Sequence, residues 1–144
     1  MLIRVKRVAG YEGPLPRYET AGAAGMDLRA AICDDYLLSV GDRATLATGI
    51  SLAIPTGYEG QVRPRSGLAK RLGLVAITGT IDADYRGEVC VILANISRDT
   101  IKISPGDRIA QLVITPVVRA FLVEADDLGE TERGEGGFGS TGLR

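Results

Sequence analysis

Residues 45–54, TLATGISLAI, alternate large aliphatic side chains with small or hydroxyl-bearing ones. Successive side chains of a β-strand point to opposite faces, so this alternation predicts a strand with one buried face. Residues 89–96 and 109–118 are instead apolar on both faces. In a chain whose other strands alternate, such two-sided strands predict burial between two sheets or against another subunit.

Turn-forming residues separate the predicted strands, and only one short segment predicts a helix. Ser66 is a favourable N-cap, and residues 67–72 give about two helical turns before Gly73 ends them. The sequence SVGDR at 39–43 returns as SPGDR at 104–108, each time between a short apolar run and a longer one, which indicates two similar hairpin turns. Many short strands with one helical segment predict an all-β fold, as a sandwich, a jelly roll or a barrel.

Composition narrows the chemistry that the chain can perform. Its 144 residues suffice for one domain with one core, and 17 basic against 18 acidic side chains argue against general nucleic-acid or membrane binding. No histidine is present, so hydrolysis would need a carboxylate, a hard metal ion or both. Cys33 and Cys90 are too few for a structural zinc site. Because no stretch resembles a signal peptide or a membrane span, we expect a cytoplasmic protein.

The last residues, 131–144, are rich in glycine and have no strand pattern. We predict one β domain over residues 1–130, followed by either a frayed tail or a lid. Two glycine patterns of nucleotide-binding loops occur in the tail, but the βαβ context of one and the lysine of the other are missing. What remains is a series of backbone N–H groups that could bind phosphate together with Arg133.

Two further segments place charged side chains at predicted turns. In PRSGLA, residues 64–69, Arg65 precedes the predicted helix, where it either contacts phosphate or is an ordinary solvated arginine. In GTIDADYRGE, residues 79–88, Asp82 either satisfies the backbone of a turn or supplies a general base. The spacing of this second segment does not complete a calcium loop.

Two polar residues interrupt apolar strands. Asp27 lies in AGMDL, residues 24–28, and Gln111 lies in IAQLV, residues 109–113. Such residues are usually hydrogen-bonded polar groups and nothing more. Together, however, they could hold waters around Mg²⁺, which keeps most of its hydration shell in proteins.

Taken in order, five segments resemble the five motifs of the trimeric deoxyuridine triphosphatases, the dUTPases; these segments are residues 24–28, 64–69, 79–88, 105–111 and 133–142. The resemblance implies a distorted jelly-roll or β-barrel subunit in a homotrimer. Each active site would draw on all three chains, with the glycine-rich tail closing over the nucleotide. The implied reaction is Mg²⁺-dependent hydrolysis of dUTP to dUMP and diphosphate, which keeps uracil out of DNA and supplies dUMP for dTMP synthesis.

The resemblance also implies a role for each matching residue. Asp82 would orient and deprotonate the water that attacks the α-phosphorus, while Asp27 and Gln111 would hold metal-bound or catalytic waters. The residues implied at the substrate are Arg65, Ser66 and Gly67 on the phosphates, Thr80, Ile81 and Asp82 at the uracil edge and the 3′-hydroxyl, Tyr85 beneath the sugar, Gln111, and Arg133, Phe138, Gly139, Ser140 and Thr141 from the tail.

One position departs from the family pattern, and two other functions compete. Many bacterial dUTPases have asparagine where this chain has Ala76, so recognition of uracil would rest more on the main chain. A dCTP deaminase of the same superfamily would need a glutamate where Ile92 stands. A trimeric β module without catalysis would need neither Arg65 nor Asp82 nor a complete tail.

Overall fold

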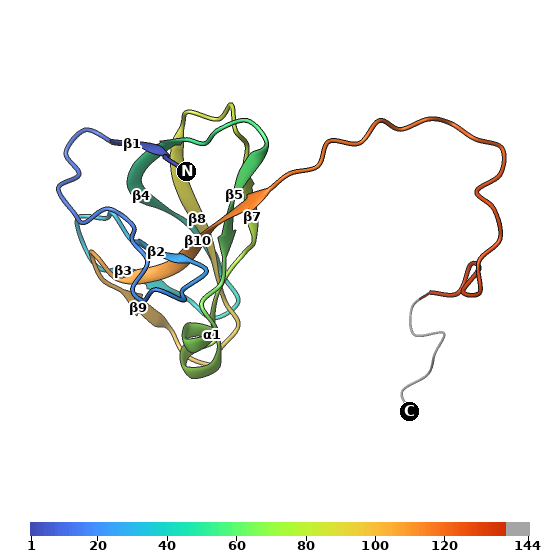
Figure 1. The fold of residues 1–144 in the computed structure, drawn as a ribbon. Coiled ribbons are helices and arrows are strands. Elements are labelled where there is room, and N and C mark those ends of the chain that lie inside the picture. Colours follow the sequence, from blue (N-terminus) through green and yellow to red (C-terminus); the bar gives the residue numbers. More distant parts are fainter. Residues whose placement is uncertain (138–144) are drawn as a thin grey trace.

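The computed structural model describes residues 1–137, and in this part of the chain strands dominate (Figure 1). The elements are β1 (Arg4–Arg7), β2 (Met26–Arg29), β3 (Tyr36–Leu38), β4 (Arg43–Ala53), β5 (Tyr58–Arg63), α1 (Ser66–Leu72), β6 (Leu74–Ala76), β7 (Gly79–Ile81), β8 (Glu88–Asn95), β9 (Ile101–Ile103) and β10 (Arg108–Pro116). They form two four-stranded sheets and a two-stranded ribbon, all antiparallel. The all-β prediction is confirmed, as a jelly-roll-like sandwich that does not close into a barrel.

The first sheet has the order β1-β4-β8-β6 and contains the alternating stretch that predicted a strand. Every even-numbered residue of β4 is buried, including Thr48, whose hydroxyl donates to the Val89 carbonyl at 2.6 Å. On β8 one face is buried, whereas Cys90 and Ile92 on the other face are exposed in the single chain. The two-sided apolar pattern of β8 therefore leaves an apolar outer face on this sheet.

The second sheet has the order β2-β10-β5-β7, so that β10 lies in its interior. Leu112 on β10 packs into the common core with Leu28 on β2 and Val62 on β5. On the opposite face of the same strands, Gln111 stands between Asp27 and Arg63 in register. This face of the sheet positions most of the polar residues discussed below.

The single helix of the described chain begins one residue earlier than predicted. Arg65, with extended backbone angles, is the N-cap, and the N–H groups of Leu68 and Ala69 donate to its carbonyl. The prediction of Ser66 as the N-cap is therefore wrong, because Ser66 is already helical. The predicted end at Gly73 is confirmed by its left-handed φ of 65°, a conformation that glycine adopts without steric cost.

The two Gly-Asp-Arg turns have the same geometry but do not form hairpins. Gly41 and Gly106 have φ values of 79° and 80°, and each turn is closed by a 3.1 Å hydrogen bond from the aspartate N–H to the preceding serine carbonyl. The strands on either side of each turn belong to different sheets, because β3 and β9 pair with each other. The repeated sequence thus makes two equivalent corners, and the hairpin prediction is wrong.

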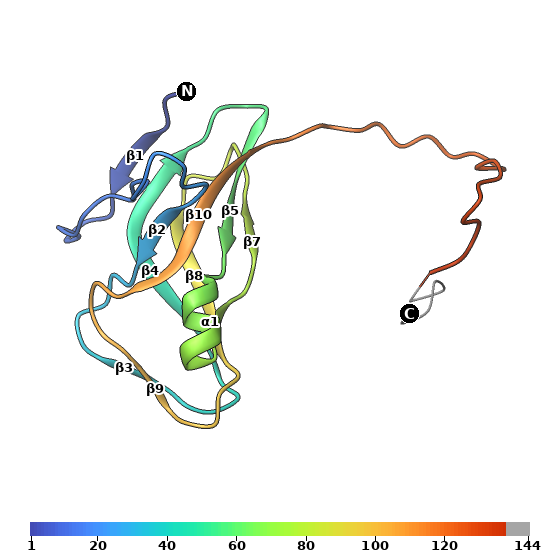
Figure 2. The same cartoon turned by 60° about the horizontal axis from the view of Figure 1, so that its bottom comes forward.

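Beyond Pro116 the chain leaves both sheets as an extended arm (Figures 1 and 2). Large apolar side chains of this arm are almost fully exposed, with Phe121 at 96% and Leu122 at 97%. The division of the chain at residue 130 stays a prediction, since the arm leaves the sheets well before that point. Within residues 1–137, no helix has the length and apolar character to span a membrane.

Candidate active site

A cluster of two arginines around one carboxylate lies at one end of the second sheet. Asp27 Oδ1 is 2.8 Å from Arg65 Nε, and Asp27 Oδ2 is 3.4 Å from Arg108 Nη1. The side chain of Asp27 is 16% exposed, and those of Arg65 and Arg108 are 26% and 47% exposed. A hydrogen bond of 3.1 Å from Arg65 Nη1 to the Arg108 carbonyl joins the two arginines. We call these residues, together with Gln111, the arginine end.

Gln111 connects the arginine end to two neighbouring segments. Its Nε2 donates to the Pro64 carbonyl at 3.0 Å and so holds the chain that leads into Arg65. Its Oε1 lies against Gly25, where a Cβ atom would collide with the amide. A glycine at position 25 therefore leaves room for the Gln111 amide. Gln111 and Asp27 are Cα partners across β10 and β2, and their predicted joint role with metal-bound water stays a prediction.

The predicted general base lies in a second place, on the turn between β7 and β8. Asp82 follows the last residue of β7, its side chain is exposed, and its carbonyl accepts the Tyr85 N–H at 3.1 Å. Tyr85 Oη donates to the Glu88 carbonyl at 3.0 Å, and Arg86 Nη1 donates to the Ala83 carbonyl at 2.7 Å. These bonds fix the turn while the Asp82 carboxylate stays open to solvent. β7 and β8 belong to different sheets and do not pair with each other; we call residues 82–87 the hairpin turn only as a short name for the tight turn between them.

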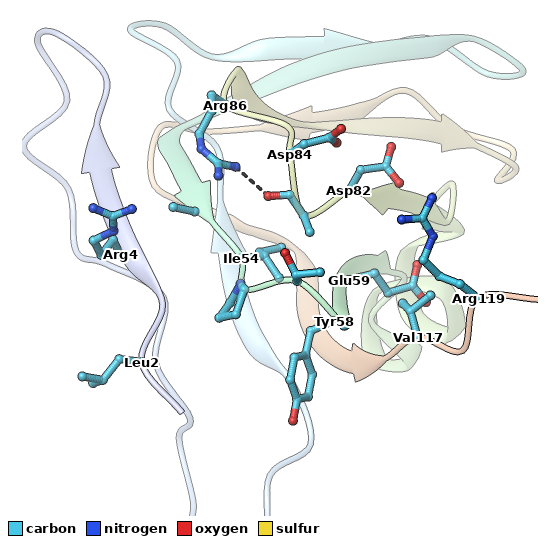
Figure 3. Close-up of a pocket in the computed structure, with 15 residues that line it drawn as sticks. Leu2, Arg4, Ile54, Tyr58, Glu59, Asp82, Asp84, Arg86, Val117 and Arg119 are labelled. Atoms are coloured by element: carbon cyan, nitrogen blue, oxygen red, sulfur yellow. Dashed lines mark hydrogen bonds between the residues drawn. The ribbon is translucent and has the colours of Figure 1, made fainter.

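A cavity of about 850 Å³ adjoins the hairpin turn (Figure 3). Asp82 and Asp84 line it together with Glu59, and Arg119 extends from the start of the arm toward Asp82 in this view. Acidic and basic side chains therefore share one open cavity with the predicted base. Such a site suits a charged, water-accessible ligand better than an apolar one.

Within one chain, the arginine end and the hairpin turn cannot reach the same phosphate. Ile81 pairs with Gly60, which places Asp82 near Glu59 at the far end of β5 from Arg65. Each strand residue advances the chain by about 3.3 Å, so the six steps from Glu59 to Arg65 span about 20 Å. The arginine end and the hairpin turn, which we call the two halves of the candidate site, therefore lie about 20 Å apart along the chain, a distance longer than a triphosphate.

The residues present do not fit a metal ion bound by the protein alone. Within residues 1–137, no three Asp, Glu, Cys or His side chains lie close enough together to hold a metal ion. Both oxygens of Asp27 face guanidinium groups, whose two positive charges outweigh its single negative charge. This surrounding disfavours Mg²⁺ and favours an anion.

The other predicted site residues are divided between the two halves and the arm. Ser66 and Gly67 are exposed beside Arg65, and Thr80 is exposed before the hairpin turn. The Ile81 side chain is buried in the core, so only its backbone can meet a ligand. Tyr85 is 46% exposed in the hairpin turn. Ala76 is also buried, in register with Leu93, and presents no side chain to a ligand.

Of the predicted tail residues, the structure describes only Arg133. Arg133 Nε donates to the Gly136 carbonyl at 2.7 Å within the arm. Phe138, Gly139, Ser140 and Thr141 lie outside the residues that the structure describes. Their predicted contacts with the nucleotide stay predictions.

Three residues of the two halves carry no assignment from the sequence. Arg108 lies inside a quoted motif, but only its ion pair in the folded chain shows that it reaches Asp27. Glu59 and Arg119 line the cavity beside Asp82, although they belong to β5 and to the arm. No short motif signals these two, because they meet through strand pairing and not through sequence spacing.

Comparisons of the sequence and the fold with known proteins all lead to the same family. The family model of dUTPase matches residues 11–142. A protein of Anaeromyxobacter sp. strain Fw109-5 named deoxyuridine 5′-triphosphate nucleotidohydrolase is 57% identical over 97% of both chains, and one of the same name from Bdellovibrio bacteriovorus is 46% identical over 99% of this chain and 97% of its own.

Solved structures with the same fold include two mutants of the dUTPase of Staphylococcus bacteriophage 80alpha. One has a TM-score of 0.88 at 28% identity and covers 96% of this chain and 98% of its own. The other, solved with dUpNHpp, has a TM-score of 0.85 at 27% identity and covers 99% of both chains. Five motifs in order, a fold in common and full-length relatives lead to one conclusion: the chain belongs to the dUTPase family.

Proposed function

We propose that this protein is an enzyme that hydrolyses dUTP to dUMP and diphosphate. Its active sites would each combine the hairpin turn of one copy with the arginine end of another, in a homotrimer. The observation that carries the proposal is that Asp82 lies beside the start of β5 and Arg65 just beyond its end, about 20 Å apart along the chain, so that a site using both is best built from two copies. The names of the relatives support the substrate.

The chemistry follows from a carboxylate base in a chain without histidine. Asp82, exposed on the rigid hairpin turn, accepts a proton from the water that attacks the α-phosphorus in line. Arg65 and Arg108 of a neighbouring copy offset the charge of the phosphates. The substrate would be the Mg²⁺ complex of dUTP, in which the metal ion would neutralise part of the negative charge of the phosphate oxygens and so ease the approach of the attacking water. A structural Mg(II) ion in a phage phi11 dUTPase is consistent with this use of magnesium.

The remaining contacts divide the nucleotide into three parts. Ser66 and Gly67 join Arg65 on the phosphates, with Gln111 beside them. Backbone groups of Thr80, Ile81 and Asp82 read the uracil edge and the 3′-hydroxyl, and Tyr85 stacks beneath the sugar. From the third copy, a lid of residues 131–144 brings Arg133, Gly139, Ser140 and Thr141 to the γ-phosphate and Phe138 to the base.

Two features of the described chain support assembly. The outer face of β8 exposes Cys90 and Ile92, which water contacts unfavourably unless another subunit covers them. The arm exposes Phe121 and Leu122 along a segment that leaves its own sheets. A second copy that covers either surface would remove this apolar area from water.

In the cell, we expect the enzyme to act in the cytoplasm, where it limits uracil in DNA and supplies dUMP.

A mixing experiment tests the shared site. Asp82→Asn and Arg65→Gln should each abolish most turnover, with Asp82→Asn slower by at least about a hundredfold. When the two variants are unfolded together and refolded at equal amounts, about a quarter of the sites receive an intact Asp82 and an intact Arg65 from different copies. Activity near that fraction supports the proposal. A mixture no more active than its components would contradict sites shared between copies.

A nucleotide panel tests the reaction itself. With Mg²⁺, dUTP should yield diphosphate, while dTTP, dCTP and UTP should yield little. Assaying the same reactions for ammonia separates hydrolysis of dUTP from deamination of dCTP. Release of ammonia from dCTP without diphosphate would replace the proposed function by the deaminase alternative.

A further inference from the structure

We propose that Arg86 is a positioning residue, which keeps the Asp82 carboxylate in the geometry that the reaction needs by fixing the backbone of the hairpin turn. The inference deepens the proposed function and rests on it, because Asp82 is the base only if the chain hydrolyses dUTP. Arg86 then determines the rate of the chemical step and not the affinity for the nucleotide.

Strand pairing does not hold the hairpin turn in shape. β7 pairs with β5 in the second sheet, whereas β8 pairs with β4 and β6 in the first. In a β-hairpin, ladder hydrogen bonds between the two strands would close the turn. Here residues 82–87 cross from one sheet to the other, so their conformation depends on hydrogen bonds made within the segment itself.

Arg86 supplies half of these local hydrogen bonds. Four hydrogen bonds join residues within 82–88, and Arg86 Nη1 donates two of them, to the Ala83 and Tyr85 carbonyls, each at 2.7 Å. These two carbonyls flank Asp84, and the first belongs to the residue directly after Asp82. One guanidinium nitrogen therefore clamps the backbone that carries the base.

The clamp acts on the backbone and not on the charge of the base. Arg86 belongs to none of the four ion pairs in the described part of the chain. Figure 3 shows its guanidinium group on one side of the turn, with the carboxylates of Asp82 and Asp84 pointing to the other. The Asp82 carboxylate thus stays open to water on a fixed support. Such support is required because a small displacement of reacting groups can cost about a hundredfold in rate.

A competing role for Arg86 is to attract phosphate by its charge, since it lines the same cavity as Arg4 and Arg119. The two roles predict different measurements. Loss of an attracting charge weakens binding in a manner that depends on salt, whereas loss of a backbone clamp slows the chemical step while the nucleotide still binds. Arg4 is a matched control, because it lines this cavity from β1 and makes no hydrogen bond to the hairpin turn in the described chain.

The test compares Arg86→Met, Arg86→Lys and Arg4→Met with the wild type, each as the full chain with Mg²⁺. Single-turnover release of diphosphate from dUTP gives the rate of the chemical step. Calorimetry with dUpNHpp, in which an imido group replaces the oxygen between the α- and β-phosphorus, gives the affinity. We expect Arg86→Met to slow the chemical step at least about tenfold and to change the affinity less than about threefold. Arg86→Lys keeps the charge on a shorter side chain and should recover only part of the rate, and Arg4→Met should react as the wild type does.

Three results would overturn the inference. The first is a wild-type rate in Arg86→Met. The second is a loss of affinity that disappears at high salt and that Arg86→Lys fully restores, and the third is an equal loss of rate in Arg4→Met, because both indicate a role of charge. Thermal unfolding checks that each variant is folded; if Arg86→Met is not, Arg86→Lys decides alone, and a wild-type rate in it would reject the clamp. A folded wild type that releases no diphosphate from dUTP would instead overturn the proposed function.

Discussion

Glu88 Oε1 accepts a hydrogen bond from the backbone N–H of Gly49 at 2.7 Å, at the place where the register between β4 and β8 shifts. Gly49 has a φ of 73°, and the ring of Tyr11 lies directly against its Cα. The irregularity is thus stabilised by one carboxylate and covered by one aromatic ring. The close approach of the Tyr11 ring requires a residue without a Cβ atom at position 49.

Gly49→Ala should therefore lower the free energy of unfolding by more than a left-handed backbone alone explains. The alanine Cβ would collide with Tyr11, and overpacking of this kind costs about 1–3 kcal/mol. Gly41→Ala is the matched control, because Gly41 has a φ of 79° but no neighbour near the added atom. It should lose only about 1–2 kcal/mol. Urea unfolding of both variants at one protein concentration compares them, and equal losses would contradict the role of Tyr11.

Asn95→Ala should destabilise the fold through its buried hydrogen bonds. Asn95 is 1% exposed, and its Nδ2 donates to the carbonyls of Leu38 at 2.9 Å and Asp99 at 2.8 Å. Removing the amide leaves these acceptors without it, which we expect to cost about 2–4 kcal/mol in unfolding free energy. Ser97→Ala, which loses a single hydroxyl bonded to the same amide, should cost about 1 kcal/mol. A milder effect for Asn95→Ala than for Ser97→Ala would refute this account.

Cys90 should react with iodoacetamide more slowly than Cys33 near neutral pH. Burial, with the nearby Glu88 carboxylate as a smaller cause, raises the pKa of the Cys90 thiol, so less of the reactive thiolate is present. Raising the pH should therefore increase the rate at Cys90, and mass spectrometry of timed samples measures both sites. In urea the two rates should converge. Equal rates in the native protein would contradict the prediction, and coverage of the β8 face by another copy would slow Cys90 further.

Deletion of residues 131–144 should abolish turnover and leave the melting temperature nearly unchanged. The arm beyond Pro116 exposes its apolar side chains and adds little to the core of its own chain. Removal of residues 143–144 alone, which lie outside the resembling motif, should preserve turnover. Calorimetry and diphosphate release measure the two properties separately. Full activity after the longer deletion would exclude a lid.

Sequence patterns predict the strands of this fold better than its turns. Alternation over residues 45–54 depends on local burial, so it fixes the two faces of β4 correctly. The turn sequences at Gly41 and Gly106 predict hairpins. This prediction is wrong because a turn sequence does not reveal whether its flanking strands pair with each other. Ser66 resembles an N-cap, yet the helix begins one residue earlier in hydrogen bonding, at the Arg65 carbonyl.

The candidate site was predictable where residues act in sequence order and not where they meet across strands. Asp27 and Gln111 stand out in the sequence as polar residues on apolar strands, and the register makes them Cα partners. The contact of Arg108 with Asp27 has no such signal, because the two residues lie far apart in the sequence and are not register partners. Likewise, Arg119 reaches the cavity of Asp82 only because β10 ends beside β5.

The separation of Glu59 from Arg65 along the chain has a consequence for how activity depends on protein concentration and on altered copies. A solitary subunit would possess every required group and yet be inert, so specific activity should fall on dilution once copies part. In the proposed homotrimer, each copy would supply its base to one site, its arginines to another and its tail to the third. A copy with substitutions at both ends of β5 would inactivate two sites, and a copy with a substitution at one end would inactivate only one.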